Sequence, residues 1–325
     1  MKPRVLVSRE VFDETLELLS VHCEVESNQA DVRYSPDELA ARLADKQGAV
    51  VSTSDRIDAA LLDRCPQLKV VANIGVGYNN IDVAACTARG IMATNTPGVL
   101  TDSVADLAFG LVIAACRRLT EAEHYLRTGQ WKANFLKQML GVDVHGATLG
   151  IIGMGRIGQA LARRALGFDM KIRYHNRTPL DAATEAQCQA EYRAKDDLLR
   201  ECDIVVLLMP YSPETHHLIG AREIELMKRT AVLVNVARGG IVDDAALVQA
   251  LKEKRIYAAA LDVYENEPNF NPGYLELKNV VLSPHIASAS EPTRKAMANT
   301  AARNCVAALT NGEPPNLLNP ECKRR

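Results

Sequence analysis

A strand–turn–helix with three glycines is the feature that most restricts how this chain can fold. The apolar run Thr148–Ile152 is typical of a buried strand, and Gly153-x-Gly155-x-x-Gly158 leads directly into a helical pattern that ends at Leu166. In such a context Gly153 permits the tight turn, Gly155 lets the backbone approach a pyrophosphate, and Gly158 lets the helix pack on the strand. The helix N-terminus then offers N–H groups to the phosphates. The spacing therefore predicts a dinucleotide site in an α/β domain.

Apolar strands and helical patterns alternate along the rest of the chain, which is typical of parallel sheets with crossover helices. A break at Thr96-Pro97-Gly98 separates a first α/β unit from a second, and the helical pattern from Ser288 to Asn311 is long enough to return to the first. We therefore predict fold class α/β with two domains. The first, expected to bind the substrate, is discontinuous and comprises residues 1–98 and 288–325. The second, expected to bind the dinucleotide, is residues 99–287. The end of the chain, Glu321–Arg325, is expected to fray.

Two helix patterns carry specific predictions. Ser35-Pro36-Asp37-Glu38 places a capping serine, a first-turn proline and early acids where a helix would begin. The stretch Thr101–Arg118 is apolar over more than one helical face. A helix of that kind is either deeply buried or part of a subunit interface, and we expect it to build a homodimer.

The composition disfavours several classes of function. Among 325 residues, 38 are Lys or Arg and 40 are Asp or Glu, so the formal net charge is −2 and favours neither nucleic acid nor a membrane as partner. The eight cysteines form no C-x-x-C pair, and several lie within apolar patterns. This favours reduced thiols in a cytoplasmic protein, without disulfides and without a metal site. No apolar run approaches membrane-spanning length.

Three residues with reactive side chains follow three successive predicted strands. Arg238 comes after the apolar run 231–237, Glu267 shortly after the run 256–263, and His285 after the run 280–283. Open α/β sheets bind their ligands at these strand ends. An arginine can hold a carboxylate by two parallel hydrogen bonds, a histidine can transfer a proton near neutral pH, and a glutamate can orient it. The set suits hydride transfer between a nicotinamide and a 2-oxo acid; the alternative is a surface cluster of ion pairs.

The other histidines lack this context and are expected to be surface residues: His22, His124, His145, His175, His216 and His217.

The loop from Gly75 to Asn80 also stands out. Two glycines and two asparagines surround Tyr78, a composition that lets backbone N–H groups point into a cleft and hold a small anion. A tight turn that uses glycine for a positive φ is equally consistent with these residues.

The end of the strand after the glycine turn bears on the cofactor. NAD sites place Asp or Glu there to accept hydrogen bonds from the ribose hydroxyls. Here the strand ends in His175-Asn176-Arg177-Thr178, and the nearest acids, Asp169 and Asp181, are poorly placed. Asn176, Arg177 and Thr178 would accommodate a 2′-phosphate, whereas a solvated arginine in a loop is the alternative.

Four ordered motifs resemble those of the D-isomer-specific 2-hydroxyacid dehydrogenases. They are GMGRIG (153–158), NVARGGIVD (235–243), LDVYENEP (261–268) and SPHIAS (283–288). The similarity runs over essentially the whole chain. Within the family it looks greatest to the bacterial glyoxylate/hydroxypyruvate reductases and 2-ketogluconate reductases, notably in the stretch 141–164.

This resemblance implies two Rossmann-like, doubly wound parallel-sheet domains with the active site in the cleft between them, and a dimerisation arm at about residues 100–130. It implies that Arg238, Glu267 and His285 are catalytic. The amides of Val76 and Gly77 would bind the substrate carboxylate together with Arg238. Asp262 would meet the nicotinamide carboxamide. The expected cofactor contacts are Gly153, Gly155, Arg156, Ile157, Gly158, Asn176, Arg177, Thr178, Met209, Pro210, Val236, Ala237, Asp262, His285 and Ala287, the last replacing a glycine common in the family.

We therefore predict a reductase of small 2-oxo acids, glyoxylate and hydroxypyruvate first and 2-ketogluconate next, which prefers NADP(H) and has NAD(H) as the alternative cofactor. Two other functions remain open. Oxidation of 3-phosphoglycerate is disfavoured because no regulatory domain follows and no basic cluster lies near Tyr78. A dinucleotide-sensing binding protein related to the family's corepressors is disfavoured because no tail or linker offers partner motifs.

Overall fold

The computed structural model describes residues 1–324, and these divide into two compact units. Unit 1 comprises residues 1–100 and the described residues from 289 onward, and unit 2 comprises residues 101–288. The assignment of a substrate role to the first and a dinucleotide role to the second stays a prediction. No helix in residues 1–324 has the length and apolar character needed to span a membrane.

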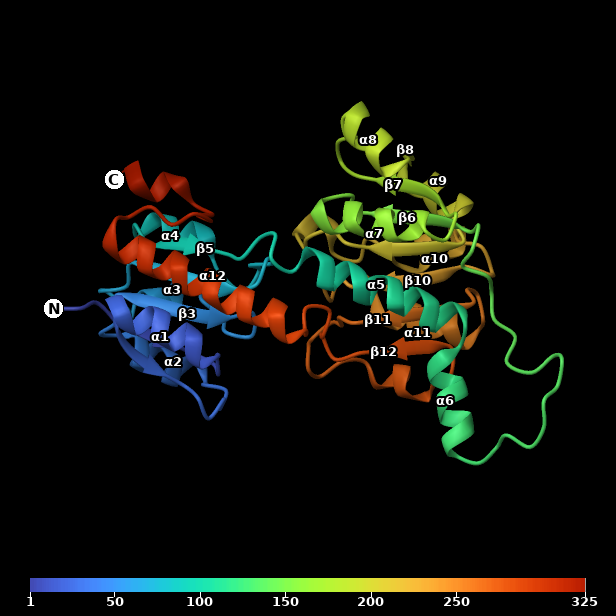
Figure 1. Ribbon diagram of the computed structural model, residues 1–325, viewed down its shortest axis with the longest axis horizontal. Coiled ribbons are helices and arrows are strands. Elements are labelled where there is room, and N and C mark those ends of the chain that lie inside the picture. Colours follow the sequence, from blue (N-terminus) through green and yellow to red (C-terminus); the bar gives the residue numbers. More distant parts are fainter. Residues whose placement is uncertain (325) are drawn as a thin grey trace. The chain divides into compact units, whose positions relative to one another are not determined.

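Unit 1 contains a five-stranded parallel sheet of order β2-β1-β3-β4-β5. Its strands are β1 (Arg4–Val7), β2 (Glu24–Ser27), β3 (Gly48–Ser52), β4 (Val70–Ile74) and β5 (Met92–Thr94). Its helices are α1 (Asp13–His22), α2 (Pro36–Leu43), α3 (Ala59–Leu62), α4 (Val83–Ala88) and α12 (Glu291–Thr310). Figure 1 labels β3 and β5 of this sheet together with the helices of the unit. Apolar side chains pack on both faces of the sheet. The predicted helix start at Ser35 is confirmed, because Ser35 Oγ accepts from the Glu38 N–H and Glu38 accepts from the Ser35 N–H.

Unit 2 is built on a seven-stranded parallel sheet of order β12-β11-β10-β9-β6-β7-β8. Its strands are β6 (Thr148–Ile152), β7 (Lys171–His175), β8 (Ala190–Tyr192), β9 (Ile204–Leu207), β10 (Val232–Asn235), β11 (Ala258–Leu261) and β12 (Val280–Leu282). Its helices are α5 (Thr101–Cys116), α6 (Leu119–Arg127), α7 (Arg156–Leu166), α8 (Ala182–Cys188), α9 (Lys195–Glu201), α10 (Ala221–Leu226) and α11 (Asp244–Lys252). The strand order reverses between β6 and β9, and such a switch point is where open sheets bind ligands.

Both sheets are buried on two faces, which explains the continuous apolar strands. In unit 2, side chains of α5 and α7 pack on one face and those of α9, α10 and α11 on the other. The α/β fold class is thus confirmed, with two parallel-sheet units. All eight cysteines are free and buried.

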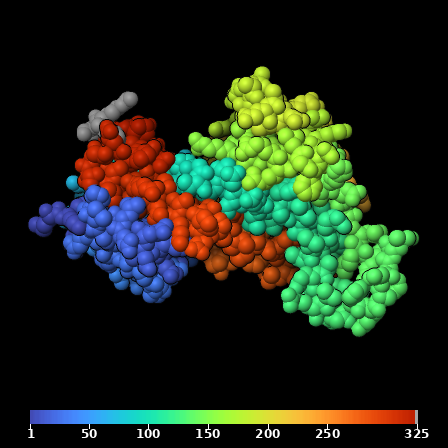
Figure 2. Space-filling model, in the orientation of Figure 1, coloured from blue at the N-terminus to red at the C-terminus, as the bar shows by residue number. Residues whose placement is uncertain are grey.

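The apolar width of α5 has an internal explanation. Eight of its sixteen residues are buried, against α7 and the strands β10 to β12. The reason for assigning this helix to a subunit interface is therefore lost. Exposed apolar side chains lie instead in the following segment, which protrudes from the surface of unit 2 (Figure 2). They are Leu119, Leu126, Trp131, Phe135, Leu136 and Leu140.

The predicted frayed end is wrong for residues 321–324. Pro320–Arg324 forms a short 3-10 helix that packs on α4, and Cys322 is only 8% exposed. The last residue of that prediction, Arg325, lies outside the described residues.

Candidate active site

The three glycines of the turn between β6 and α7 have different reasons to be glycine. Gly153 has φ +103°, and a Cβ there would lie 2.6 Å from the Met209 nitrogen. A Cβ on Gly158 would lie 2.6 Å from the Gly153 carbonyl oxygen. The packing of the protein itself therefore requires glycine at both positions.

Gly155 is the exception. It is the N-cap of α7 with φ −81° and ψ −159°, a backbone that alanine can adopt. A Cβ there would have no heavy atom of the described residues within 4 Å. The fold leaves open space at this glycine, beside the first N–H groups of α7, which include those of Arg156 and Ile157. Such a helix start is suited to a phosphate group.

Asn176 joins the end of β7 to the glycine turn. Its Oδ1 accepts a hydrogen bond of 2.7 Å from the Met154 N–H. Asp181, one of the nearby acids, is committed to capping α8, where it accepts from the Thr184 N–H at 2.9 Å. Arg177 and Thr178 are exposed beyond Asn176. The pKa of Glu214 is lowered by its hydrogen bond with Ser212 and, more weakly, by the charge of Arg177. The end of β7 thus presents a cation and an amide.

Arg238, Glu267 and His285 follow β10, β11 and β12, which are adjacent strands of one sheet. His285 Nδ1 lies 2.8 Å from Glu267 Oε2, and Glu267 Oε1 accepts from the Tyr264 N–H at 2.8 Å. A carboxylate can only accept, so Nδ1 carries the hydrogen. The other ring nitrogen, Nε2, is left to exchange a proton with a ligand.

The segments that carry Arg238 and Glu267 are packed against each other. A Cβ on Gly239 would lie 1.7 Å from the Tyr264 carbonyl oxygen, so glycine is required for this approach. The Arg238 guanidinium donates to the Ala237 carbonyl at 2.7 Å. Burial lowers the pKa of Arg238, and the Glu267 charge opposes that effect.

Burial alone would raise the pKa of Glu267. The His285 hydrogen bond and charge, the Tyr264 N–H and the Arg238 charge outweigh burial and hold the pKa below its ordinary value. Glu267 is therefore an ionised acceptor at neutral pH, the form that can orient and stabilise a protonated imidazole.

Asp262 anchors the turn that presents His285. Its carboxylate is fully buried and accepts from Ser283 Oγ at 2.6 Å and from the N–H groups of Ile286 and Ala287, both at 2.8 Å. These bonds hold His285 in a left-handed conformation, φ +54°. The expected contact of Asp262 with a carboxamide stays a prediction, whereas its anchoring of this turn is a feature that the sequence did not reveal.

The remaining predicted cofactor contacts in unit 2 lie at the same edge of the sheet. Met209 and Pro210 follow β9, and Val236 and Ala237 follow β10. Met209 reaches the glycine turn, since its nitrogen would be the nearest atom to a Cβ on Gly153.

In unit 1 the loop after β4 has its carbonyl groups tied to the protein. The Gly75 carbonyl accepts from the Thr96 N–H at 3.0 Å, the Val76 carbonyl from Asn95 Nδ2 at 2.8 Å and the Gly77 carbonyl from Asn73 Nδ2 at 2.9 Å. In a planar trans peptide the following N–H points the opposite way. The amides of Val76, Gly77 and Tyr78 therefore point away from these three bonded carbonyl oxygens, and successive N–H groups directed away from such bonds can bind an anion. Tyr78 is therefore a third candidate for anion binding, in addition to the predicted Val76 and Gly77.

His217 lies at the surface, as expected, but it is not isolated there. Its side chain is 37% exposed and its Nε2 lies 2.7 Å from Glu265 Oε1. These residues are 48 positions apart, so no local pattern could have revealed the pair.

A shallow pocket of about 310 Å³ lies elsewhere in unit 2, lined by Asp143, His145, Asp203 and Thr230 among others. It sits where β6 and β9 begin, at the opposite edge of the sheet from every predicted site residue of this unit. The chemistry described above does not extend to it.

Comparison with known proteins agrees with this geometry. The family model described as "D-isomer specific 2-hydroxyacid dehydrogenase, NAD binding domain" matches residues 109–287. The glyoxylate reductase of Thermococcus kodakarensis is 48% identical over 99% of this chain and 97% of its own length. That of Aeropyrum pernix is 48% identical over 98% and 97%. Among solved structures, an NADPH-dependent glyoxylate/hydroxypyruvate reductase from Sinorhizobium meliloti, in complex with NADP and malonate, is 37% identical with a TM-score of 0.88, covering 99% of this chain and 98% of that one.

Proposed function

Because the chain belongs to the D-isomer-specific 2-hydroxyacid dehydrogenase family and is an NAD(P)-dependent oxidoreductase, we propose that it reduces small 2-oxo acids to D-2-hydroxy acids. Glyoxylate and hydroxypyruvate are the first candidates, and 2-ketogluconate is a further one. The observation that carries the proposal is the ion pair of His285 with Glu267 beside Arg238, at the ends of three adjacent strands.

Each of these residues has a distinct role in the proposed reaction. Arg238 holds the substrate by two hydrogen bonds and polarises its carbonyl group, and the amides of residues 76–78 bind the carboxylate. The nicotinamide, when bound, supplies the hydride that adds to C2. His285 gives the proton on Nε2 to the carbonyl oxygen, which becomes a neutral hydroxyl group while the imidazole becomes neutral. Glu267 stabilises the protonated imidazole before the transfer, since it accepts from Nδ1 at 2.8 Å.

The proposed preference for NADPH over NADH rests on the residues that follow β7. Arg177 is exposed there, and no carboxylate occupies the position that would accept from ribose hydroxyls. One charge-assisted hydrogen bond to a 2′-phosphate contributes about 1.5–3 kcal/mol, so the expected preference is roughly tenfold to a hundredfold.

A double substitution tests that preference. Asn176→Asp with Arg177→Ala should favour NADH, because the aspartate can still accept from the Met154 N–H while its second oxygen accepts from the ribose and repels phosphate. The measurement is kcat/KM for each cofactor with saturating glyoxylate. A wild type that already favours NADH would refute the role of Arg177 and leave the catalytic assignment intact.

We also propose a homodimer formed through the exposed apolar side chains of residues 119–140. Light scattering should report about twice 35.5 kDa for the wild type, and Leu136→Asp should shift the mass toward the monomer because that side chain is 94% exposed in a single chain. A monomeric wild type would contradict the proposal.

The reaction itself is tested by kcat/KM over a panel of 2-oxo acids with both cofactors, in buffer with a metal chelator. Glyoxylate and hydroxypyruvate should rank first, and 3-phosphohydroxypyruvate should be a poor substrate. Absence of turnover by a folded, cofactor-binding protein would favour a dinucleotide-sensing role instead.

A further inference from the structure

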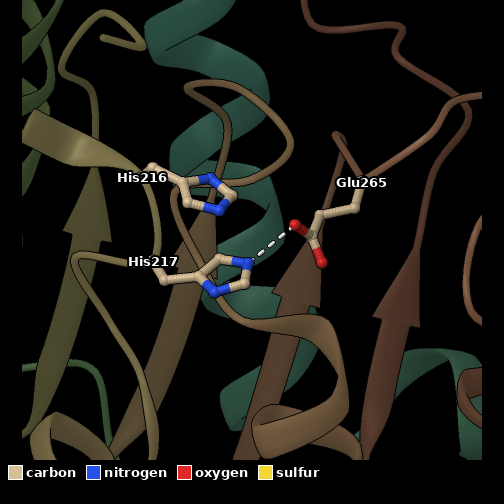
Figure 3. A group of neighbouring side chains, drawn as sticks. All are labelled: His216, His217 and Glu265. Atoms are coloured by element: carbon tan, nitrogen blue, oxygen red, sulfur yellow. Dashed lines mark hydrogen bonds and ion pairs between the residues drawn. The ribbon is translucent and has the colours of Figure 1, made fainter. Parts of the chain in front are cut away.

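Two histidines and a glutamate that the proposed reaction does not use lie together in unit 2. His216 and His217 directly follow a short 3-10 helix, Pro213–Thr215, after β9, and Glu265 follows β11. Figure 3 shows a ring nitrogen of His217 joined to the Glu265 carboxylate by a dashed line, with the His216 ring lying beside that of His217. One ligand atom from each of the three residues lies within 4.8 Å of the other two. Among residues 1–324 this is the one such set of His, Cys, Asp and Glu side chains.

We propose that His216, His217 and Glu265 bind one divalent cation of the zinc class. Two imidazole nitrogens with one carboxylate oxygen suit Zn²⁺, whereas Mg²⁺ and Ca²⁺ prefer sites made of oxygen alone. Three protein ligands leave the fourth tetrahedral position to water.

The pair His217–Glu265 is already assembled, with Nε2 and Oε1 2.7 Å apart. Backbone conformation brings the second imidazole to the same side. His217 has a left-handed φ of +50°, and its ring stacks on that of His216 with centroids 3.9 Å apart. Ligand atoms around tetrahedral zinc are about 3.4 Å apart, given bonds of about 2.1 Å. The ligand atoms must therefore approach one another by up to about 1.4 Å, from 4.8 Å or less. A bound cation also lies in the plane of each imidazole, so one ring must rotate out of the stack, and the exposed His216 ring is the one free to do so without disturbing the core.

The outer contacts of the two histidines also fit metal ligands. A histidine that binds a metal generally uses its second ring nitrogen in a hydrogen bond, which fixes the ring. Tyr211 Oη lies 3.2 Å from His216 Nδ1, and Asp243 Oδ2 lies 3.9 Å from His217 Nδ1. His216 Nδ1 is therefore within hydrogen-bond distance of an oxygen atom, whereas His217 Nδ1 has a carboxylate only at ion-pair distance, beyond a hydrogen bond. The Nε2 atoms are the ones available to the cation.

The site is attached to both catalytic segments. The His217 N–H donates to the Gly240 carbonyl at 2.8 Å, two residues after Arg238. Glu265 precedes Glu267 by two residues, and its own N–H donates to the buried Asp244. A cation that binds His217 and Glu265 would tie these segments together and hinder their adjustment around a substrate. We therefore expect the cation to inhibit the enzyme.

The binding experiment uses the whole purified chain and Zn²⁺ in competition with a chromophoric chelator. Wild type should bind one Zn²⁺ at this site, and His216→Ala and Glu265→Gln should each weaken that binding at least tenfold, since even loss of an outer contact typically costs 10- to 100-fold. His145→Ala is the matched control, because His145 is also an exposed histidine near a carboxylate, 3.6 Å from Asp169. Equal Zn²⁺ affinity in wild type and His216→Ala would overturn the proposal.

Inhibition is measured separately, as glyoxylate reduction against increasing free Zn²⁺. His216→Ala should keep its metal-free rate and lose the inhibition, and His145→Ala should be inhibited like wild type. Inhibition that persists in His216→Ala would place the effect at another site, such as the pair His285–Glu267, and would overturn the inhibitory role. The binding result does not depend on the proposed substrate, so the two proposals fail independently.

Discussion

The substitution Gly155→Ala tests whether glycine is required at this position by the folded protein or by a bound cofactor. Nothing in the described protein lies within 4 Å of the new methyl group, and the backbone at this position has a negative φ. Alanine should therefore be accepted by the folded protein. If a pyrophosphate approaches the backbone here, the same methyl group stands between the phosphate and the amides that would bind it.

The magnitudes can be estimated for both effects. Alanine restricts the unfolded chain, which stabilises the protein by about 0.4–1 kcal/mol, but it is a poorer N-cap than glycine by a similar amount. The free energy of unfolding should therefore change by less than about 1 kcal/mol. Loss of one charge-assisted hydrogen bond weakens cofactor binding by about 1.5–3 kcal/mol, which raises Kd roughly tenfold to a hundredfold.

The assay is NADPH fluorescence titration together with urea denaturation. Gly110→Ala is the control, because it too has open space around it but lies inside helix α5. It should gain about 0.5–1 kcal/mol of stability and keep the wild-type Kd. Gly158→Ala should instead be destabilised, since its Cβ would lie 2.6 Å from a carbonyl oxygen. Wild-type NADPH affinity in Gly155→Ala, or a large loss of stability, would refute the reasoning.

Three further predictions concern the catalytic residues and the core. Arg238→Lys should lower kcat/KM for glyoxylate about tenfold to a hundredfold, because lysine cannot make the two parallel hydrogen bonds to the substrate. A variant with near wild-type kcat/KM would rule out this mode of substrate binding. Glu267→Gln should move the high-pH limb of the reduction profile to lower pH, since the protonated imidazole loses its charged partner; an unchanged profile would count against the pair. Burial raises the pKa of three thiols to about 12: Cys86, Cys116 and Cys202. Unfolded thiols titrate near pH 8.5, so the unfolded state releases these protons first and the free energy of unfolding should fall above roughly pH 9, by about 1.4 kcal/mol per pH unit for each thiol. Urea denaturation at rising pH measures this, and constant stability would contradict it.

The elements that the sequence predicts best are those with continuous apolar strands. β9 and β10, buried on both faces, are apolar except for the final Asn235, and their neighbours in the sheet follow the same pattern. The edge strands β2 and β8 were not predicted. They read Glu-Val-Glu-Ser and Ala-Glu-Tyr and are only partly buried, so neither carries the pattern of a strand.

The residues of the site also differ in whether the sequence alone could predict them. Arg238, Glu267 and His285 could be found because each directly follows or closely trails a strand, and parallel strands end at one edge of the sheet. The residues that hold these three in place could not be found from the sequence. Asp262 serves the His285 turn through bonds to residues 21 to 25 positions away, and His217 meets Glu265 only because two loops pack together. Contacts of that range depend on tertiary structure and leave no local pattern.

Hydride transfer to C2 of a 2-oxo acid is the central claim, and an isotope experiment tests it most directly. The protein is incubated with hydroxypyruvate and NADPH that carries deuterium at both C4 positions of the nicotinamide, and the product is analysed by chiral chromatography with mass spectrometry. The account predicts D-glycerate with one deuterium, at C2. Product of L configuration, product without deuterium at C2, or no product would contradict it.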